Sequence, residues 1–84
     1  MSKISEENKE RIKTNVLRTI FDEAPLPLSA TAIATLEVRD KQFILKLLQD
    51  LEKQKIVRNV TQKFSRKSYW IMTDQAYKKY KELL

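Results

Sequence analysis

The chain has 84 residues, of which 42% are hydrophobic and 33% charged, and its 17 Lys and Arg exceed its 11 Asp and Glu to give a net charge of +6. A chain of this length forms one small domain, and the positive charge favours anionic partners, nucleic acid first and an acidic protein or membrane surface second. It contains no Cys, His or Gly, which excludes disulfide bonds, Cys/His zinc sites, His-based catalytic triads and Gly-rich phosphate loops.

The first predicted element is a helix over residues 5–23. Ser5 is a favourable N-cap, and apolar residues recur at the spacing of one helical face through the rest of the segment. Pro25 and Pro27 follow, and they end the helix because the proline ring fixes φ and proline has no backbone N–H. They also predict an extended stretch over residues 24–28.

The next two predicted elements are helices joined by a tight turn. Residues 29–36 form a short helix with Ser29 as its N-cap. Residues 39–54 form a longer helix with an apolar stripe of helical period. Asp40 near the start of the longer helix suits the positive end of the helix dipole.

The pattern changes after the third helix. Residues 56–62 and 68–73 are rich in β-branched and aromatic side chains, and a polar, basic segment lies between them. Two such runs with a short connector predict a β-hairpin over residues 56–73. This segment carries four basic residues and no acidic one, so it holds most of the net charge. A last helix is predicted over residues 74–84.

The apolar faces of these elements predict one shared core. We expect Phe64, in the hairpin turn, to fold back onto the sheet, and contact with a sugar or a base is the alternative. The residues expected to be buried together are Ile12, Val16, Ile20, Ile33, Leu36, Ile44, Leu48, Leu51, Trp70 and Met72.

The element order and three short motifs resemble the winged helix-turn-helix family, in particular small MarR- and PadR-type regulators of bacteria, archaea and their viruses. Residues 27–38 resemble the segment that leads into the turn of this family. Residues 51–58, LEKQKIVR, resemble its L-E-x-x-G-L-I/V-x-R junction from recognition helix to wing, with the final Arg one place early. Residues 70–76, WIMTDQA, resemble its Y-x-L-T-x-x-G exit from the wing, with Trp70 in place of Tyr and Met72 in place of Leu. Lys55 and Ala76 stand where the family has Gly.

The resemblance implies an α+β winged helix-turn-helix fold, with a three-helix core, a β-hairpin wing and a C-terminal helix in a single domain over residues 1–84. It implies that the third helix enters the major groove of double-stranded DNA and that the wing contacts the DNA backbone. The residues expected to contact DNA from the recognition helix are Arg39, Lys41, Gln42, Leu45, Lys46 and Gln49. Those expected to contact it from the wing are Arg58, Lys63, Arg66 and Lys67.

The expected function is sequence-specific binding of double-stranded DNA by a small transcriptional regulator, with no cofactor and no evident small-molecule effector. The resemblance also implies a homodimer through the terminal helices, and packing of the same side chains on the first helix is the alternative. No segment suggests a membrane span or a signal peptide, so a cytoplasmic protein is expected, associated with the nucleoid if the host is prokaryotic. The expected dimer residues are Tyr77, Tyr80, Leu83 and Leu84.

Two other interpretations compete with DNA binding. The exposed Lys and Gln side chains could merely solvate an outer face, and the charge of the wing could merely protect an edge strand from aggregation. Winged helices also serve as protein–protein adaptors within polymerase or other complexes, although an adaptor has no need of an acid-free wing. An enzyme is not expected, because the chain lacks paired nucleophile and base residues.

Overall fold

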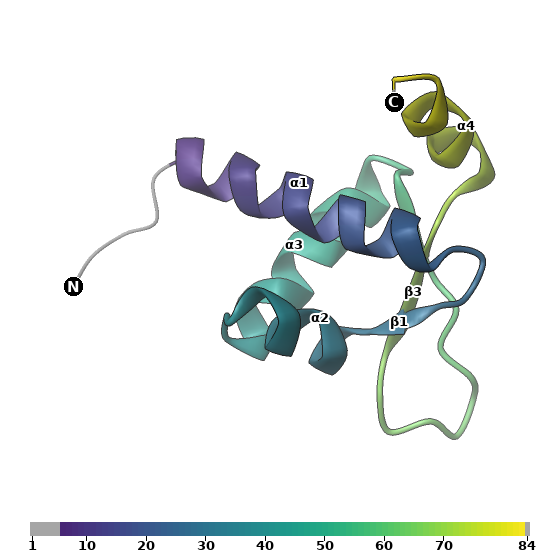
Figure 1. The fold of residues 1–84 in the computed structure, drawn as a ribbon. Coiled ribbons are helices and arrows are strands. Elements are labelled where there is room, and N and C mark those ends of the chain that lie inside the picture. The colour runs from purple at the N-terminus through teal and green to yellow at the C-terminus, as the bar shows by residue number, and fades with distance from the viewer. Residues whose placement is uncertain (1–5, 84) are drawn as a thin grey trace.

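The computed structural model describes residues 6–83, and these residues form four helices and a three-stranded sheet (Figure 1). This is the α+β order that the sequence predicts. Ser5, the expected N-cap of the first helix, and Leu84, an expected dimer residue, lie outside the described residues. In chain order the elements are α1 (Glu6–Glu23), β1 (Leu28–Ser29), α2 (Ala30–Glu37), α3 (Lys41–Lys53), β2 (Val57–Asn59), β3 (Tyr69–Met72) and α4 (Asp74–Glu82).

The segment between α1 and β1 differs from the prediction. An extended stretch was expected over residues 24–28, but the chain turns there. The Ala24 N–H donates to the carbonyl of Phe21 at 3.2 Å, and the Leu26 N–H donates to the carbonyl of Glu23 at 2.9 Å. The fixed φ of proline suits a turn as well as an extended chain, so the extended part shrinks to the two residues of β1.

The sheet is antiparallel with strand order β1-β3-β2. In β3, Trp70 and Met72 are buried as predicted, and they pair with Leu28 of β1 and Val57 of β2. The strands β2 and β3 are shorter than the predicted 56–62 and 68–73. One reason lies just after β2, where a side-chain oxygen of Asn59 accepts the N–H of Thr61 at 2.9 Å and turns the chain away from the strand ladder.

The core forms where α1 packs against α2 and the sheet, and α3, which passes behind α1 in Figure 1, closes it by packing against α2 and β2. Nine of the ten residues expected to be buried are buried. Leu36 is the exception, because 61% of its surface is exposed. The buried face of α2 consists of Ala30, Ile33 and Ala34. At about 100° per residue, Leu36 lies about 60° from Ile33 and about 160° from Ala34, just beyond the edge of that face. Val57 adds to the core from β2.

Candidate nucleic-acid interface

The outer face of α3 carries polar and basic side chains. The helix buries Ile44 and Leu48 among others, and the positions on its opposite face are exposed. All of the predicted contact residues on this side are exposed except Leu45, which packs partly against the core and therefore offers less surface than expected. The exposed ones are Arg39, Lys41, Gln42, Lys46 and Gln49.

The helix α3 starts two residues later than predicted, and Asp40 is the reason. The Asp40 carboxylate accepts the backbone N–H groups of Gln42 at 3.0 Å and Phe43 at 3.4 Å, so Asp40 is the N-cap. Arg39 therefore precedes the helix and belongs to the turn. The N–H of Arg39 donates to the carbonyl of Ala34 at 2.9 Å. This hydrogen bond ends α2 and holds the turn that leads into α3.

Two non-glycine residues adopt left-handed backbone at the ends of α2 and α3. Val38 has a φ of 55° and Lys55 a φ of 63°. At each position the N–H of the next residue reaches back five residues, from Arg39 to Ala34 and from Ile56 to Leu51, both at 2.9 Å. This is the Schellman arrangement, in which glycine is usual. The turn into the wing is therefore a Schellman turn with Lys55 at the position where glycine is usual.

Thr73 joins the exit of the wing to the end of α3. Its hydroxyl donates to the carbonyl of Lys55 at 2.9 Å, and its backbone N–H donates to the carbonyl of Ile56 at 3.0 Å. The same hydroxyl oxygen accepts the N–H of Ala76 at 3.2 Å and caps α4. Thr is a favourable N-cap residue, but its hydrogen bond to a carbonyl 18 residues away leaves no mark in a local sequence pattern.

The four basic residues of the wing, Arg58, Lys63, Arg66 and Lys67, are all exposed. None of these four basic residues forms an ion pair within residues 6–83. The ion pair found in that part of the chain lies on α1, where Lys13 and Glu10 are 3.6 Å apart. The positive charge of the wing is therefore free to meet an external anion. Figure 1 shows the wing loop extending away from α1 and α4, at the far end of the sheet.

Phe64 contradicts the expectation that it folds back onto the sheet. Its side chain is 90% exposed, and it is absent from the residues packed against the core. A hydrogen bond from the Ser65 N–H to the Gln62 carbonyl at 3.0 Å closes a tight turn, and Phe64 lies in the middle of that turn, where its side chain cannot reach the strands. The polar residues on both sides of Phe64 in the sequence are the feature that indicates a position at the tip of a loop.

The aromatic residues of α4 pack on the chain's own α1. The ring centroids of Tyr77 and Phe21 lie 4.8 Å apart, and those of Tyr80 and Phe21 lie 4.6 Å apart. Both tyrosines are half-buried by this contact, which is the alternative that the sequence left open for them. Leu83 remains 81% exposed.

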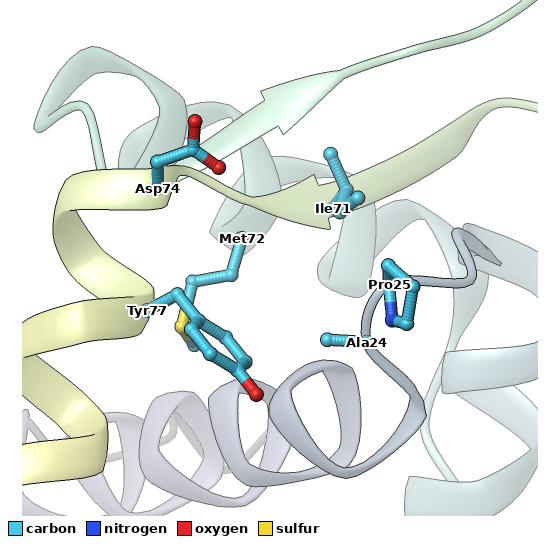
Figure 2. A pocket seen from close by; sticks show the side chains of 6 residues that line it. All are labelled: Ala24, Pro25, Ile71, Met72, Asp74 and Tyr77. Atoms are coloured by element: carbon cyan, nitrogen blue, oxygen red, sulfur yellow. The ribbon is translucent and has the colours of Figure 1, made fainter.

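A small pocket lies where the end of α1, β3 and α4 meet (Figure 2). Its volume is about 260 Å³, and the ring of Tyr77 reaches into it from α4. The lining is mainly apolar, with the carboxylate of Asp74 at one side. No such pocket was evident from the sequence. It is lined by Ala24, Pro25, Ile71, Met72, Asp74 and Tyr77.

The described part of the chain shows neither a metal site nor a membrane-spanning helix. Residues 6–83 contain no group of three or more Asp, Glu, His or Cys side chains placed to hold a metal ion. Among the same residues, no helix combines the length and the apolar character needed to cross a membrane.

Comparison with known proteins identifies the fold. No family model and no curated protein matches the sequence, but solved structures do. MepR of S. aureus in complex with DNA has a TM-score of 0.77 at 18% identity, over 86% of this chain and 59% of that chain. ZitR of Lactococcus lactis has a TM-score of 0.70 at 18% identity, over 86% of this chain and 48% of that chain.

AF1382 of Archaeoglobus fulgidus is similar over more of its own length, with a TM-score of 0.76 at 17% identity, over 88% of this chain and 81% of that chain. The chain thus spans about half the length of MepR and ZitR. These similarities confirm the predicted fold, a winged helix-turn-helix with a three-helix core, a hairpin wing and a C-terminal helix.

Proposed function

We propose that the protein binds double-stranded DNA through α3 and the wing, and that it acts as a small transcriptional regulator. The observation that carries the proposal is the exposed, acid-free wing next to a helix whose free face is basic and polar. The solved complex of MepR with DNA, and the description of MepR as a transcription regulator, support the proposal by similarity of fold. For this role we propose a cytoplasmic location, with association with the nucleoid if the host is prokaryotic.

The proposed base-reading element is α3. A major groove about 12 Å wide admits one α-helix, and Lys41 and Gln42 stand in the first turn of α3, where a recognition helix meets base edges. A lysine suits guanine O6 and N7, and a glutamine suits adenine N6 and N7. Lys46 and Gln49 continue the same exposed face.

The proposed contact with the DNA backbone comes from the wing. Arg58, Lys63, Arg66 and Lys67 would neutralise phosphates, and each contact releases condensed counterions. Since phosphates carry no sequence information, these residues supply affinity and α3 supplies specificity. The position of the wing relative to α3 is held by the turn at Lys55 and by the hydrogen bonds of Thr73.

Regulators of this type bind two half-sites, and we propose a homodimer that uses α4. Leu83 is 81% exposed beside the tyrosines that pack on α1, so α4 can bury it against the same helix of a second copy. Leu84 is proposed for the same interface. Sedimentation velocity tests this proposal, and a monomer at high micromolar concentration would refute the dimer while leaving DNA binding intact.

The experiment that tests DNA binding is fluorescence anisotropy with a random-sequence duplex at two salt concentrations. We expect binding that weakens steeply between about 50 mM and about 200 mM salt, as counterion release requires. A protein that fails to bind duplex DNA at the lower salt concentration would contradict the proposal. In that case the exposed Leu36 and Val38 at the turn between α2 and α3 would favour the alternative function, a protein–protein adaptor.

A further inference from the structure

The wing tip combines an aromatic ring with cations on a turn that is held by hydrogen bonds. Phe64 has the most exposed of the large apolar side chains among the described residues, with 90% of its surface accessible. The Nζ of Lys63 lies 5.7 Å from the centroid of its ring. Arg66 and Lys67 follow within three residues, and no acidic residue occurs anywhere in the wing.

The loop that carries Phe64 is held by hydrogen bonds within the chain itself. The Gln62–Ser65 hydrogen bond of 3.0 Å closes the turn at the tip. The Ser65 hydroxyl donates to the carbonyl of Lys67 at 2.9 Å and accepts the N–H of Lys67 at 3.3 Å. At the base of the loop, the Tyr69 N–H donates to the hydroxyl of Thr61 at 3.0 Å. Because the tip is already held, presenting the ring to a partner costs little further ordering.

The charge around the ring selects the class of partner. An apolar ring surrounded by cations suits a polyanion that also offers flat aromatic surfaces, and DNA has both, since its phosphates flank stacked bases. Proteins that bend DNA insert apolar side chains between base steps from the minor groove and unstack them. The wing tip of this protein carries an exposed phenylalanine of this apolar kind, with basic side chains beside it in the chain.

We propose that Phe64 inserts between base pairs of the duplex that α3 binds and bends the DNA at that step. The proposal rests on the DNA-binding function proposed above. It adds a second source of specificity, because pyrimidine–purine steps unstack more easily than others. The wing would then favour TA or CA steps at a position where it makes no hydrogen bond to a base.

The test uses one DNA duplex of about 30 base pairs, roughly three helical turns, chosen from a random pool by binding to the wild-type protein and labelled with a fluorophore at each end. Binding is measured by anisotropy and bending by energy transfer between the two ends. The variants are Phe64→Ala and Phe64→Trp. The matched control is Leu26→Ala, which truncates an apolar side chain that is 66% exposed and lies outside the wing.

We expect Phe64→Ala to bind about tenfold more weakly, which equals about 1.4 kcal/mol, and to abolish the change in energy transfer. The dependence of its affinity on salt should stay that of the wild type, because no charge is removed. Phe64→Trp should bind and bend normally, and its fluorescence should be quenched on binding, over the constant signal of the buried Trp70. Leu26→Ala should behave as the wild type.

The outcomes separate the two proposals. If the wild type binds duplex DNA with steep salt dependence and Phe64→Ala binds and bends it equally well, the wedge is wrong and the DNA-binding function stands. If Phe64→Ala weakens binding to a single strand as much as to the duplex, the ring stacks on unpaired bases and the wedge is also wrong. If the wild type binds no duplex, both proposals fall.

Discussion

Replacing Lys55 with Gly should stabilise the protein, although Gly usually destabilises. Lys55 has a φ of 63°, where an L-residue with a side chain is disfavoured by about 1–2 kcal/mol. Gly removes this cost but loses about 0.5–1 kcal/mol more backbone entropy on folding. The net gain therefore lies between about 0 and 1.5 kcal/mol, with a midpoint of about 0.75 kcal/mol. For a domain of this size the midpoint corresponds to a rise of about 3–6 °C in Tm.

The assay is urea unfolding followed by the fluorescence of Trp70, which is the single Trp of the chain and is 2% exposed in the folded state. The matched control is Lys53→Gly, two residues earlier at the last residue of α3, where the backbone is helical and Gly should destabilise the protein by up to about 1 kcal/mol. If both variants lost stability equally, the left-handed turn at Lys55 would be wrong, and with it the geometry that sets the start of the wing.

Three further predictions address the core, base reading and the wing. Leu48→Ala should cost about 2–5 kcal/mol of unfolding free energy, because Leu48 is fully buried, and a melting curve like that of the wild type would contradict its place in the core. Gln42→Ala should reduce discrimination at one base pair by about 1–3 kcal/mol, and equal weakening on every competitor duplex would show that Gln42 reads no base. Joint replacement of Arg66 and Lys67 by Ala should lower the slope of log K against log salt by roughly 2, and an unchanged slope would mean that the wing touches no phosphate.

The helical part of the fold could be predicted from the sequence because its signals are local. The N-cap at Ser29 and the apolar period of α3 each act within a few residues. Leu36 could not be placed correctly, because α2 is short and small alanines form much of its buried face. Its exposure depends on which face α1 and α3 cover, and periodicity in eight residues does not settle that.

The wing was predicted as a hairpin, but its details depend on side-chain hydrogen bonds. Asn59 and Thr61 bond to each other and to the backbone just after β2 and shorten the ladder. Phe64 has an apolar side chain, so hydropathy favoured burial, whereas the tight turn that holds it faces solvent. The contacts proposed with DNA remain predictions, because residue type and exposure alone do not specify a base.

The hydroxyl of Thr73 has a consequence for local opening of the chain. One oxygen atom joins the turn that directly follows α3, through the Lys55 carbonyl, to the first turn of α4, through the Ala76 N–H. Fraying of either helix end breaks the constraint on the other, so the two ends belong to one cooperative opening unit although about 20 residues separate them. The amide protons of Ile56 and Ala76 should therefore exchange with solvent at similar free energies, and Thr73→Val should accelerate the exchange of both.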